Sequence, residues 1–324
     1  MTHVRIGFHA SHEQFTPSRL LTLVQEAESA GFDAAMSSDH LAPWGLAQGQ
    51  SGFSWSWIAA ALATTSFPIG MVAAPGQRYH PVIVAQAIAT LEEMFPGRYW
   101  AALGSGEAIN EHVTSDPWPP KSEREVRLRE SVDVIRRLLA GERVDHDGVV
   151  RVHDARVWSR PAVPPPLRAT AVTPETAAWA AEWADGLITV GHDPAGLQKV
   201  ARAYTDAGGS GPVAVQVHVC LASSIDEGLG VAAEQWRHGT APGEVMWELE
   251  QPEDFDRMSD PGDEETLRSA VLIDTDAASM AERLAEVAAS GFQEMFLHHV
   301  GLDQSAFLER ARDELLPALR EAVA

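Results

Sequence analysis

The stretch "GFDAAMSSDHLAPW", residues 31–44, contains the unit from which we predict the fold. Gly31 ends a helical pattern in which apolar residues recur at three- and four-residue spacings. The run "AAMSS" that follows indicates a buried strand, and a second helix is expected over about residues 55–64. Strands that alternate with helices in this way are typical of parallel β/α units.

The same unit recurs about eight times along the chain. We therefore predict an α/β protein whose residues 1–324 form a single-domain (β/α)8 TIM barrel. The strand-like runs, in chain order, are "VRIGFHA", "AAMSS", "PIGMVA", "YWAAL", "LRATAV", "GLITVG", "VAVQVHVCLA" and "EMFLHHV".

Two stretches interrupt the alternation. Residues 141–166, "GERVDHDGVVRVHDARVWSRPAVPPP", contain alternating residues, a DG turn and a Pro-rich end, which predict a hairpin and a rigid connector. Residues 238–268 are acidic, rich in Pro and Gly, and weakly periodic. We expect this second stretch to be an insertion that caps the C-terminal mouth of the barrel.

The composition narrows the classes of function. The chain has 46 acidic and 24 basic side chains, a formal net charge of -22, which disfavours nucleic acid and anionic membranes as partners. Cys220 is the single cysteine, so no intrachain disulfide can form. The sequence shows no export signal and no apolar run long enough to span a membrane. We expect a cytoplasmic protein with a small-molecule substrate.

Polar side chains follow the second and the fourth predicted strands, within a group of three neighbouring loops. Asp39, His40 and Trp44 come after the second strand, and Glu107 and Asn110 come after the fourth. In a TIM barrel these loops open on one face, where active sites lie. Histidine titrates near neutral pH and a buried carboxyl can hold a proton, so His40 and Glu107 could form a base and acid pair.

Each of these residues also has a plainer interpretation. His40 could be a hydrogen-bonded packing residue, Trp44 could anchor its loop against the start of the next helix, and Glu107 could be a helix-start carboxylate. Asp39 could hold His40 in one tautomer, or it could point into the barrel and bond backbone amides. The sequence leaves these alternatives open.

Two further motifs give only weak evidence for a nucleotide-binding loop or a metal site. "LGSGEAINE" lacks the third glycine of a dinucleotide loop and the Lys-Ser/Thr of a P-loop. "HASHE" and the pair His298 and His299 suggest a metal site, but neighbouring side chains on one strand point to opposite faces. We predict no metal.

Three motifs together, "HASHEQF", "SDHLAPW" and "LGSGEAINE", resemble those of the luciferase-like flavin oxidoreductases. Within that family the chain is most similar to the glucose-6-phosphate dehydrogenases that use the deazaflavin coenzyme F420. The similarity extends through "RYHP", "VIVAQAIATLEEMFPGR" and "WADGLIT". It implies a (β/α)8 barrel with the coenzyme ring at the C-terminal ends of the strands.

The resemblance also implies roles for particular residues. His40 matches the active-site base, Glu107 the group that exchanges a proton at the ring, and Trp44 a side chain that stabilises the reacting complex. The family has a bulge with a non-proline cis peptide that presses on the ring, which would fall at Val72 and Ala73. Further coenzyme contacts match Asp39, Asn110 and the main chain of Gly106.

Several positions depart from the family pattern. Basic residues that hold a sugar phosphate are replaced at His192 and near Met246 and Ser269, so glucose 6-phosphate is not expected as substrate. Val172 and Thr173 stand where the relatives have a paired glycine beside the coenzyme phosphate. Both positions would lie next to the coenzyme tail. The coenzyme is therefore FMN or F420, and these departures favour FMN slightly.

We accordingly predict an oxidoreductase that transfers a hydride between a flavin-type coenzyme and a small organic substrate. An FMN-dependent monooxygenase is one alternative, and a flavin-binding barrel without catalysis is another. The resemblance also implies a homodimer that forms through helices on the side of the barrel.

Overall fold

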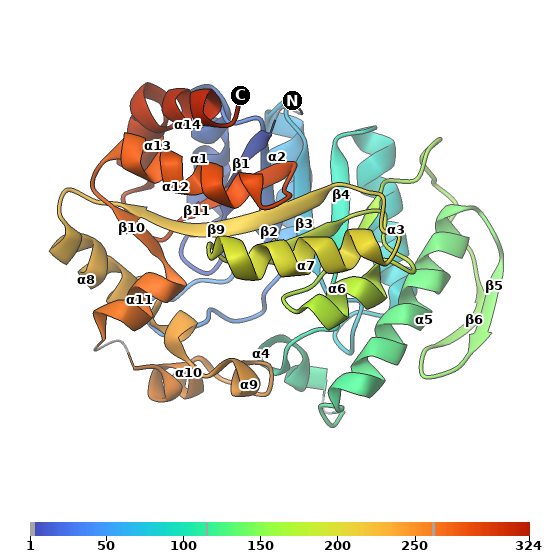
Figure 1. The fold of residues 1–324 in the computed structure, drawn as a ribbon. Helices are drawn as coiled ribbons and strands as arrows, with labels where there is room; N and C mark the ends of the chain where they lie inside the picture. The colour runs from blue at the N-terminus through green and yellow to red at the C-terminus, as the bar shows by residue number, and fades with distance from the viewer. Residues whose placement is uncertain (1–3, 115, 261–262) are drawn as a thin grey trace.

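The computed structural model describes residues 4–114, 116–260 and 263–324. Eight parallel strands form a closed barrel with helices around it, so the predicted TIM barrel is confirmed (Figure 1). The ring closes because β9 pairs with β8 on one side and with β11 on the other, and β11 pairs with β1. The barrel strands are β1 (Arg5–Ala10), β2 (Ala34–Ser38), β3 (Ile69–Ala73), β4 (Tyr99–Leu103), β7 (Leu167–Thr170), β8 (Leu187–Val190), β9 (Val213–Leu221) and β11 (Glu294–His299).

Large side chains fill the middle of the barrel, and glycines at the paired positions of adjacent strands make room for them. A Cβ atom on Gly7 would lie 2.3 Å from the ring of Phe296, and one on Gly70 would lie 1.9 Å from the indole of Trp100. Phe296 and Trp100 contact one another across the lumen with ring centroids 5.7 Å apart. The barrel is thus packed through its centre, and open space is left only toward an end.

Helices cover the outside of the barrel. Gly31 ends the first of them in a left-handed conformation with φ 96°, and its N–H bonds the carbonyls of Ala27 and Glu28, as the sequence predicts. The covering helices are α1 (Pro17–Ala30), α2 (Ser54–Thr64), α3 (Pro81–Met94), α5 (Lys121–Leu139), α6 (Pro174–Ala180), α7 (Pro194–Asp206), α8 (Ile225–Gln235), α12 (Ala277–Ala289), α13 (Gln304–Arg310) and α14 (Leu316–Ala322), with a π-helical turn η3 (Ala311–Leu315) between the last two.

Two smaller pieces of sheet complete the strands. The predicted hairpin is confirmed, because β5 (Val144–Asp147) pairs antiparallel with β6 (Arg151–Ala155). A further short strand, β10 (Leu272–Asp274), extends the sheet beside the carboxyl end of β9 and was not predicted. Within the described residues, no helix combines the length and apolar character that a membrane span requires.

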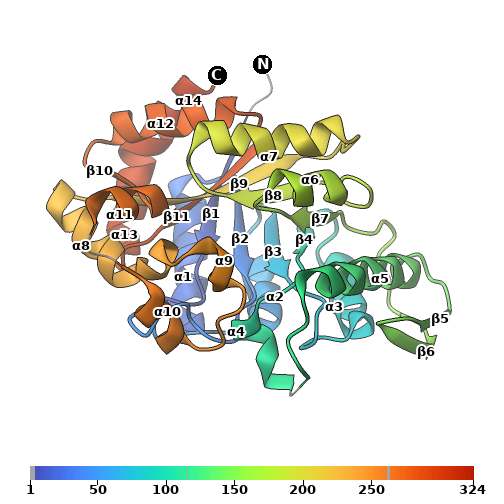
Figure 2. The same cartoon turned by 60° about the horizontal axis from the view of Figure 1, so that its bottom comes forward.

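The stretch 238–268 contains short helical elements, with residues 261 and 262 outside the described part. They are η2 (Arg237–Thr240), α9 (Gly243–Met246), α10 (Pro252–Met258) and α11 (Glu264–Ala270). Figure 2 shows α9 and α10 beside α4 (Ala108–Glu111), the helix that follows β4 and leads into the turn η1 (His112–Thr114). Trp247 accepts a 3.1 Å hydrogen bond from the backbone of Ala108, so this stretch is tied to the loop after β4.

Candidate active site

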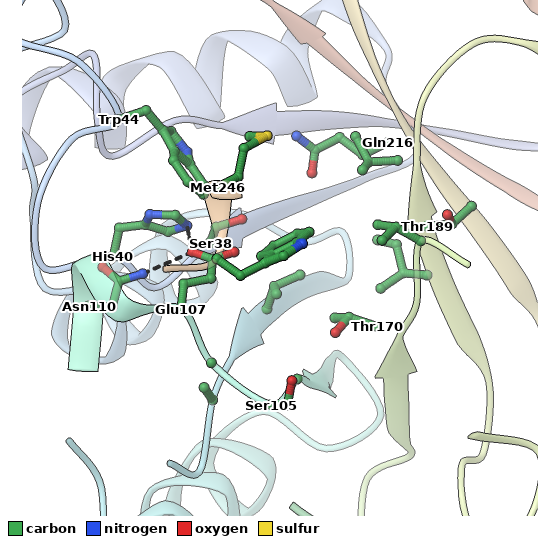
Figure 3. A pocket seen from close by; sticks show the side chains of 18 of the residues that line it. Ser38, His40, Trp44, Ser105, Glu107, Asn110, Thr170, Thr189, Gln216 and Met246 are labelled. Carbon is green, nitrogen blue, oxygen red and sulfur yellow. Dashed lines mark hydrogen bonds and ion pairs between the residues drawn. The ribbon is translucent and has the colours of Figure 1, made fainter. Parts of the chain in front are cut away.

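A cavity of about 490 Å³ opens at the carboxyl ends of the barrel strands. Its wall combines residues from loops after β2, β3, β4 and β7 with side chains of β8, β9 and the stretch 238–268. Figure 3 shows His40 and Glu107 on one side of this cavity and the hydroxyls of Thr170 and Thr189 on the other. All ten residues predicted for the site, from Asp39 to Thr173, line the cavity.

His40 lies between two carboxylates. Its Nε2 atom is 3.8 Å from Oε1 of Glu13 and 4.0 Å from Oε2 of Glu107, and only 9 % of its side chain is exposed. The Nδ1 atom is buried and has no hydrogen-bond partner in the described part of the chain. These separations are longer than hydrogen bonds, as is common at catalytic sites without a bound ligand. The His40 ring therefore packs beside Trp44 and has no short hydrogen bond from either ring nitrogen in the described residues.

Glu107 is held in place by Asn110. The amide nitrogen of Asn110 donates to Oε2 of Glu107 at 3.1 Å, and its oxygen accepts from the backbone of Leu41 at 2.8 Å. Glu107 is the N-cap residue of α4, as the helix-start interpretation has it, and its side chain makes no capping bond there. Burial raises the pKa of the Glu107 carboxyl, and the nearby Glu13 carboxylate acts in the same direction. The group therefore retains its proton to higher pH.

Asp39 forms an ion pair that neither sequence interpretation included. Its Oδ2 accepts from the guanidinium of Arg78 at 2.8 Å, and its backbone oxygen accepts from the same Arg78 nitrogen at 3.0 Å. Burial raises the pKa of Asp39, whereas Arg78 opposes that change. Oδ1 is buried without a hydrogen-bond partner in the described residues. The Asp39 side chain is fully buried beside Arg78, and hydrogen bonding with Tyr79 also acts to lower its pKa.

Trp44 joins the His40 loop to the stretch 238–268. Its indole lies 4.8 Å from the His40 ring, stacks on His238 with centroids 5.4 Å apart, and meets the edge of Phe255 at 5.3 Å. The contact with Phe255 arises because α10 brings that ring to the loop. Trp44 therefore forms a wall of the cavity next to His40.

The loops after β3 and β4 bring main chain to the cavity. The predicted cis peptide at Val72 and Ala73 is wrong, since none of the described residues has a cis peptide bond. Val72 pairs in register with Ser38 and with Ala102, which keeps β3 regular. Gly106 has φ 84°, and a Cβ there would meet Glu111 at 3.2 Å, so a glycine suits this turn.

Val172 and Thr173 lie at another part of the cavity, between β7 and α6. The hydroxyl of Thr173 accepts from the backbone of Thr176 at 3.3 Å, whereas the Val172 side chain is exposed. Lys121 approaches the hydroxyl of Thr176 at 3.2 Å. This part of the cavity therefore presents the hydroxyls of Thr173 and Thr176 and the ammonium group of Lys121. A pair of glycines would instead expose the main chain.

The three positions where the sugar-phosphate residues are replaced offer no free cation. His192 bonds the Arg268 carbonyl at 2.9 Å, and burial lowers the pKa of His192, which favours the neutral ring. Ser269 donates to the backbone of Thr266 at 2.7 Å, and Met246 lines the cavity with an apolar side chain.

Several cavity residues were not predicted. Glu13 belongs to "HASHE", which was considered only as a metal motif, although its place directly after a strand is the signal that applied to Asp39. Polar residues at alternating positions of the apolar run "VAVQVHV" could have indicated inward-facing side chains. The unpredicted residues include Glu13, Gln216, His218, Trp236, His238, Trp247 and His298.

His298 and His299 face opposite ways, as the alternation along a strand predicts. His298 lines the cavity and stacks on His9 with centroids 4.4 Å apart. His299 stacks on Phe307 outside the barrel and pairs with Asp303 at 3.0 Å. The two rings therefore cannot contact one ligand.

A family model for luciferase-like monooxygenases matches residues 1–294. Among relatives, the chain is 35 % identical to an F420-dependent glucose-6-phosphate dehydrogenase of Beutenbergia cavernae, with 98 % of each chain covered. It is 33 % identical to the enzyme of the same name from Microbacterium testaceum, with 99 % of each covered.

Solved structures agree with the barrel. An F420-dependent secondary alcohol dehydrogenase in complex with an F420-acetone adduct matches with TM-score 0.89 and 27 % identity, over 98 % of this chain and 99 % of the other. The coenzyme F420 dependent tetrahydromethanopterin reductase from Methanopyrus kandleri matches with TM-score 0.77 and 20 % identity, over 98 % and 99 % of the two chains. The second likeness shows the fold alone.

Proposed function

The chain belongs to the luciferase-like monooxygenase family as a flavin- or F420-dependent oxidoreductase, and we propose that it uses F420 to oxidise a small uncharged alcohol or to reduce the matching carbonyl. An uncharged substrate is supported by one observation: the cationic side chains at the cavity already form ion pairs with carboxylates. Lys121 and Arg124 are the Lys and Arg residues in its described lining. Lys121 lies 3.5 Å from Glu125, and Arg124 lies 3.0 Å from Glu248.

A sugar phosphate fits this cavity poorly. A phosphate dianion needs unpaired cations or several donors, and here each nearby cation already has a carboxylate partner. The cavity also holds two carboxylates near His40, which would repel a dianion. An uncharged alcohol needs no cation and is not repelled by the carboxylates. The F420-dependent secondary alcohol dehydrogenase, with which this chain shares its fold, supports an alcohol as the substrate class.

The cavity fits a deazaflavin coenzyme. Its volume of about 490 Å³ accommodates a flat ring, and buried polar atoms without partners in the described residues, Asp39 Oδ1 and Thr189 Oγ1, can bond ring or tail atoms. The hydroxyls of Thr170 and Thr173, which line the cavity, could donate to the phosphate of the tail. When bound, F420 supplies a carbon that accepts or returns a hydride.

His40 and Glu107 handle the protons in this proposal. His40 takes the hydroxyl proton through Nε2 as hydride leaves the substrate carbon, so no free alkoxide forms. Glu107, whose pKa is raised by burial, would be the residue that holds a proton for exchange at the coenzyme ring. Trp44 keeps water from one side of His40. General acid-base help of this kind contributes about 10²- to 10⁴-fold in rate.

FMN is the competing coenzyme. The replacement of the paired glycine by Val172 and Thr173 is the observation that favours it, whereas the printed names of the relatives favour F420. The monooxygenase alternative depends on FMN, because oxygen activation requires a flavin that reacts with oxygen. Proton handling by His40 would be common to both.

Coenzyme titration followed by anaerobic turnover tests the proposal. We expect F420 to bind and its visible absorbance to bleach when isopropanol is added without oxygen. Glucose 6-phosphate, tested in parallel, should give no saturable rate. Tight binding of FMN alone, or product formation only in the presence of oxygen, would replace the proposal by the monooxygenase. Binding of neither coenzyme would favour a barrel without this catalysis.

Two expectations from the sequence stay predictions. We propose a homodimer that forms through helices on the side of the barrel, and sedimentation of the purified protein would measure its mass against that of one 324-residue chain. We likewise propose a cytoplasmic location, which fractionation of the source cells would test.

A further inference from the structure

Gln216 and His218 are polar residues on the inner face of β9, within an otherwise apolar strand. Their neighbours Val215 and Val217 are fully buried on the outer face. β9 is four strands away from β3 in either direction around the ring, so the two lie on opposite walls of the barrel. What Gln216 presents to the cavity depends on the orientation of its amide group.

A backbone carbonyl fixes the first step of a hydrogen-bond chain that leads to Gln216. The oxygen of Val300 can only accept, and the side chain of Gln14 lies 2.7 Å from it, so the Gln14 amide nitrogen donates there. The Gln14 oxygen is then left to accept from Nε2 of His298 at 2.9 Å. His298 therefore bears its proton on Nε2.

The tautomer of His298 sets the next bond. Burial lowers the pKa of His298 well below its usual range, so the ring is neutral and Nδ1 is an acceptor. The amide nitrogen of Gln216 lies 3.5 Å from this Nδ1 and 3.1 Å from Nε2 of His218. An amide nitrogen has two hydrogens, so Gln216 can donate one to each ring.

The Gln216 oxygen is consequently turned away from both imidazoles. This oxygen has no hydrogen-bond partner in the described part of the chain, and it is not fully buried. Because Gln216 lines the cavity, the exposed oxygen faces it. Figure 3 shows the oxygen of Gln216 directed toward the open centre of the cavity, with Met246 beside the residue. The opposite orientation of the Gln216 amide would place its oxygen against Nδ1 of His298, which is itself an acceptor.

We propose that the carbonyl oxygen of Gln216 accepts a hydrogen bond from a second hydroxyl group of the substrate, so that the preferred substrates are uncharged diols or polyols. The inference rests on the proposed function, because it concerns the alcohol whose reacting hydroxyl lies at His40. A simple alcohol leaves the Gln216 oxygen without a donor. Leaving such an acceptor unpaired in a closed site costs about 1–3 kcal/mol, roughly 10- to 100-fold in rate.

The position of Gln216 favours the substrate over the coenzyme as the donor. The residues predicted from the sequence to contact the coenzyme lie on or after β2, β3, β4 and β7, and β3 is the strand opposite β9 in the ring. The rings near Gln216 belong instead to the wall that includes Trp44. His218 contacts Trp236 at 4.4 Å, Trp236 contacts His238 at 4.4 Å, and His238 stacks on Trp44.

The test compares alcohols that differ by one hydroxyl group. With F420 and the intact enzyme, kcat/KM is measured for a secondary butanol and for the butanediols. We expect at least one diol to exceed the butanol by about tenfold or more. Gln216→Met, which has similar volume but no acceptor, should remove most of this preference. Met246→Leu, a neighbouring apolar exchange, serves as the matched control and should keep the preference.

Several results would overturn the inference. Equal kcat/KM for the butanol and all the diols in the wild-type enzyme would do so without any variant. A preference that survives in Gln216→Met would show that another group selects the diol. Weaker F420 binding by Gln216→Met with an unchanged preference would assign the oxygen to the coenzyme. If no alcohol is oxidised at all, the proposed function itself fails, which is a distinct result.

Discussion

The two ends of the barrel both bury charged side chains, but they treat them differently. At the amino end, Glu294 on β11 pairs with Arg168 on β7 and with Arg5 on β1, the latter at 2.8 Å. The Arg168 guanidinium also lies 4.2 Å from the centre of the Trp100 ring. At the carboxyl end, Glu13 accepts a hydrogen bond from Ser11 and Glu107 accepts one from Asn110, and the ionisable side chain that both carboxylates approach is the His40 ring.

The different environments of these buried carboxylates indicate that one end of the barrel contributes to stability and the other to function. A buried carboxylate with cations beside it loses little on leaving water, whereas carboxylates gathered around one imidazole remain electrostatically unsatisfied. Such groups change their protonation readily, which suits proton transfer. We infer that the amino end stabilises the barrel and the carboxyl end performs the chemistry. The following predictions test this division.

The largest expected effect is on turnover. His40→Ala removes the base at the mouth, so kcat should fall by about 10²- to 10⁴-fold while the Kd of the coenzyme changes little. Steady-state kinetics and coenzyme titration measure the two quantities. A variant that turns over its true substrate at the wild-type rate would end the assignment of His40 as base.

The second effect is on stability, at the other end. Glu294→Gln leaves Arg168, of which 4 % of the side chain is exposed, without its buried partner. The free energy of unfolding should fall by about 3–5 kcal/mol, as measured by denaturant titration, because an unpaired buried charge is costly. kcat of the folded variant should stay near that of the wild type.

Arg5→Met provides the matched control for that variant. The Arg5 side chain is 43 % exposed, so its ion pair with Glu294 is screened by water and should contribute no more than about 1 kcal/mol. Equal losses in the two variants would show that the buried pair is not what stabilises this end. A large loss of kcat in folded Glu294→Gln would contradict the inference that the amino end of the barrel contributes to stability and not to the chemistry.

Asp39→Ala should have a smaller effect, and on binding. Asp39 has a buried oxygen without a partner in the described residues and lies at the cavity wall, so its loss should weaken coenzyme binding by about tenfold. At saturating coenzyme, kcat should change far less than in His40→Ala. A change in kcat as large as that of His40→Ala would place Asp39 in the proton-transfer step instead.

The smallest effect concerns stability against pH. The folded protein holds the Glu107 proton to higher pH than the unfolded chain, so the folded state binds more protons in that interval. The contribution of Glu107 to stability is present at acid pH and is lost as pH rises through its raised pKa. Unfolding free energies of wild type and Glu107→Gln should therefore diverge with pH, with the wild type falling more steeply. Parallel curves would contradict the raised pKa.

Much of the architecture could be predicted from the sequence, because it depends on local patterns. Each of the eight barrel strands corresponds to an apolar run that the sequence shows plainly, and Gly31 ends its helix as expected. The meeting of His40 and Glu107 was also predictable, since loops after parallel strands open on one face. These two residues lie 67 positions apart in the chain (107 minus 40) and yet approach to 4.0 Å.

The partners of the site residues could not be predicted in the same way. The ion pair of Asp39 with Arg78 depends on how the turn after β3 folds back, and the contact of Trp44 with Phe255 depends on the path of α10. The contacts of Gln216 with His218 and His298 depend on the register of β9 against β11, which the closed barrel fixes. The cis peptide was implied by resemblance and not by the residues themselves, and β3 remains regular at Val72.

Transfer of a deuterium label tests the central claim most directly. A secondary alcohol deuterated at its carbinol carbon is incubated anaerobically with F420 and enzyme, and the reduced coenzyme is isolated and its label content measured. The account predicts that the label appears in the coenzyme, that the reaction is slower than with the unlabelled alcohol, and that both depend on His40. Product that forms only with oxygen, or reduced coenzyme without the label, would contradict hydride transfer at this site.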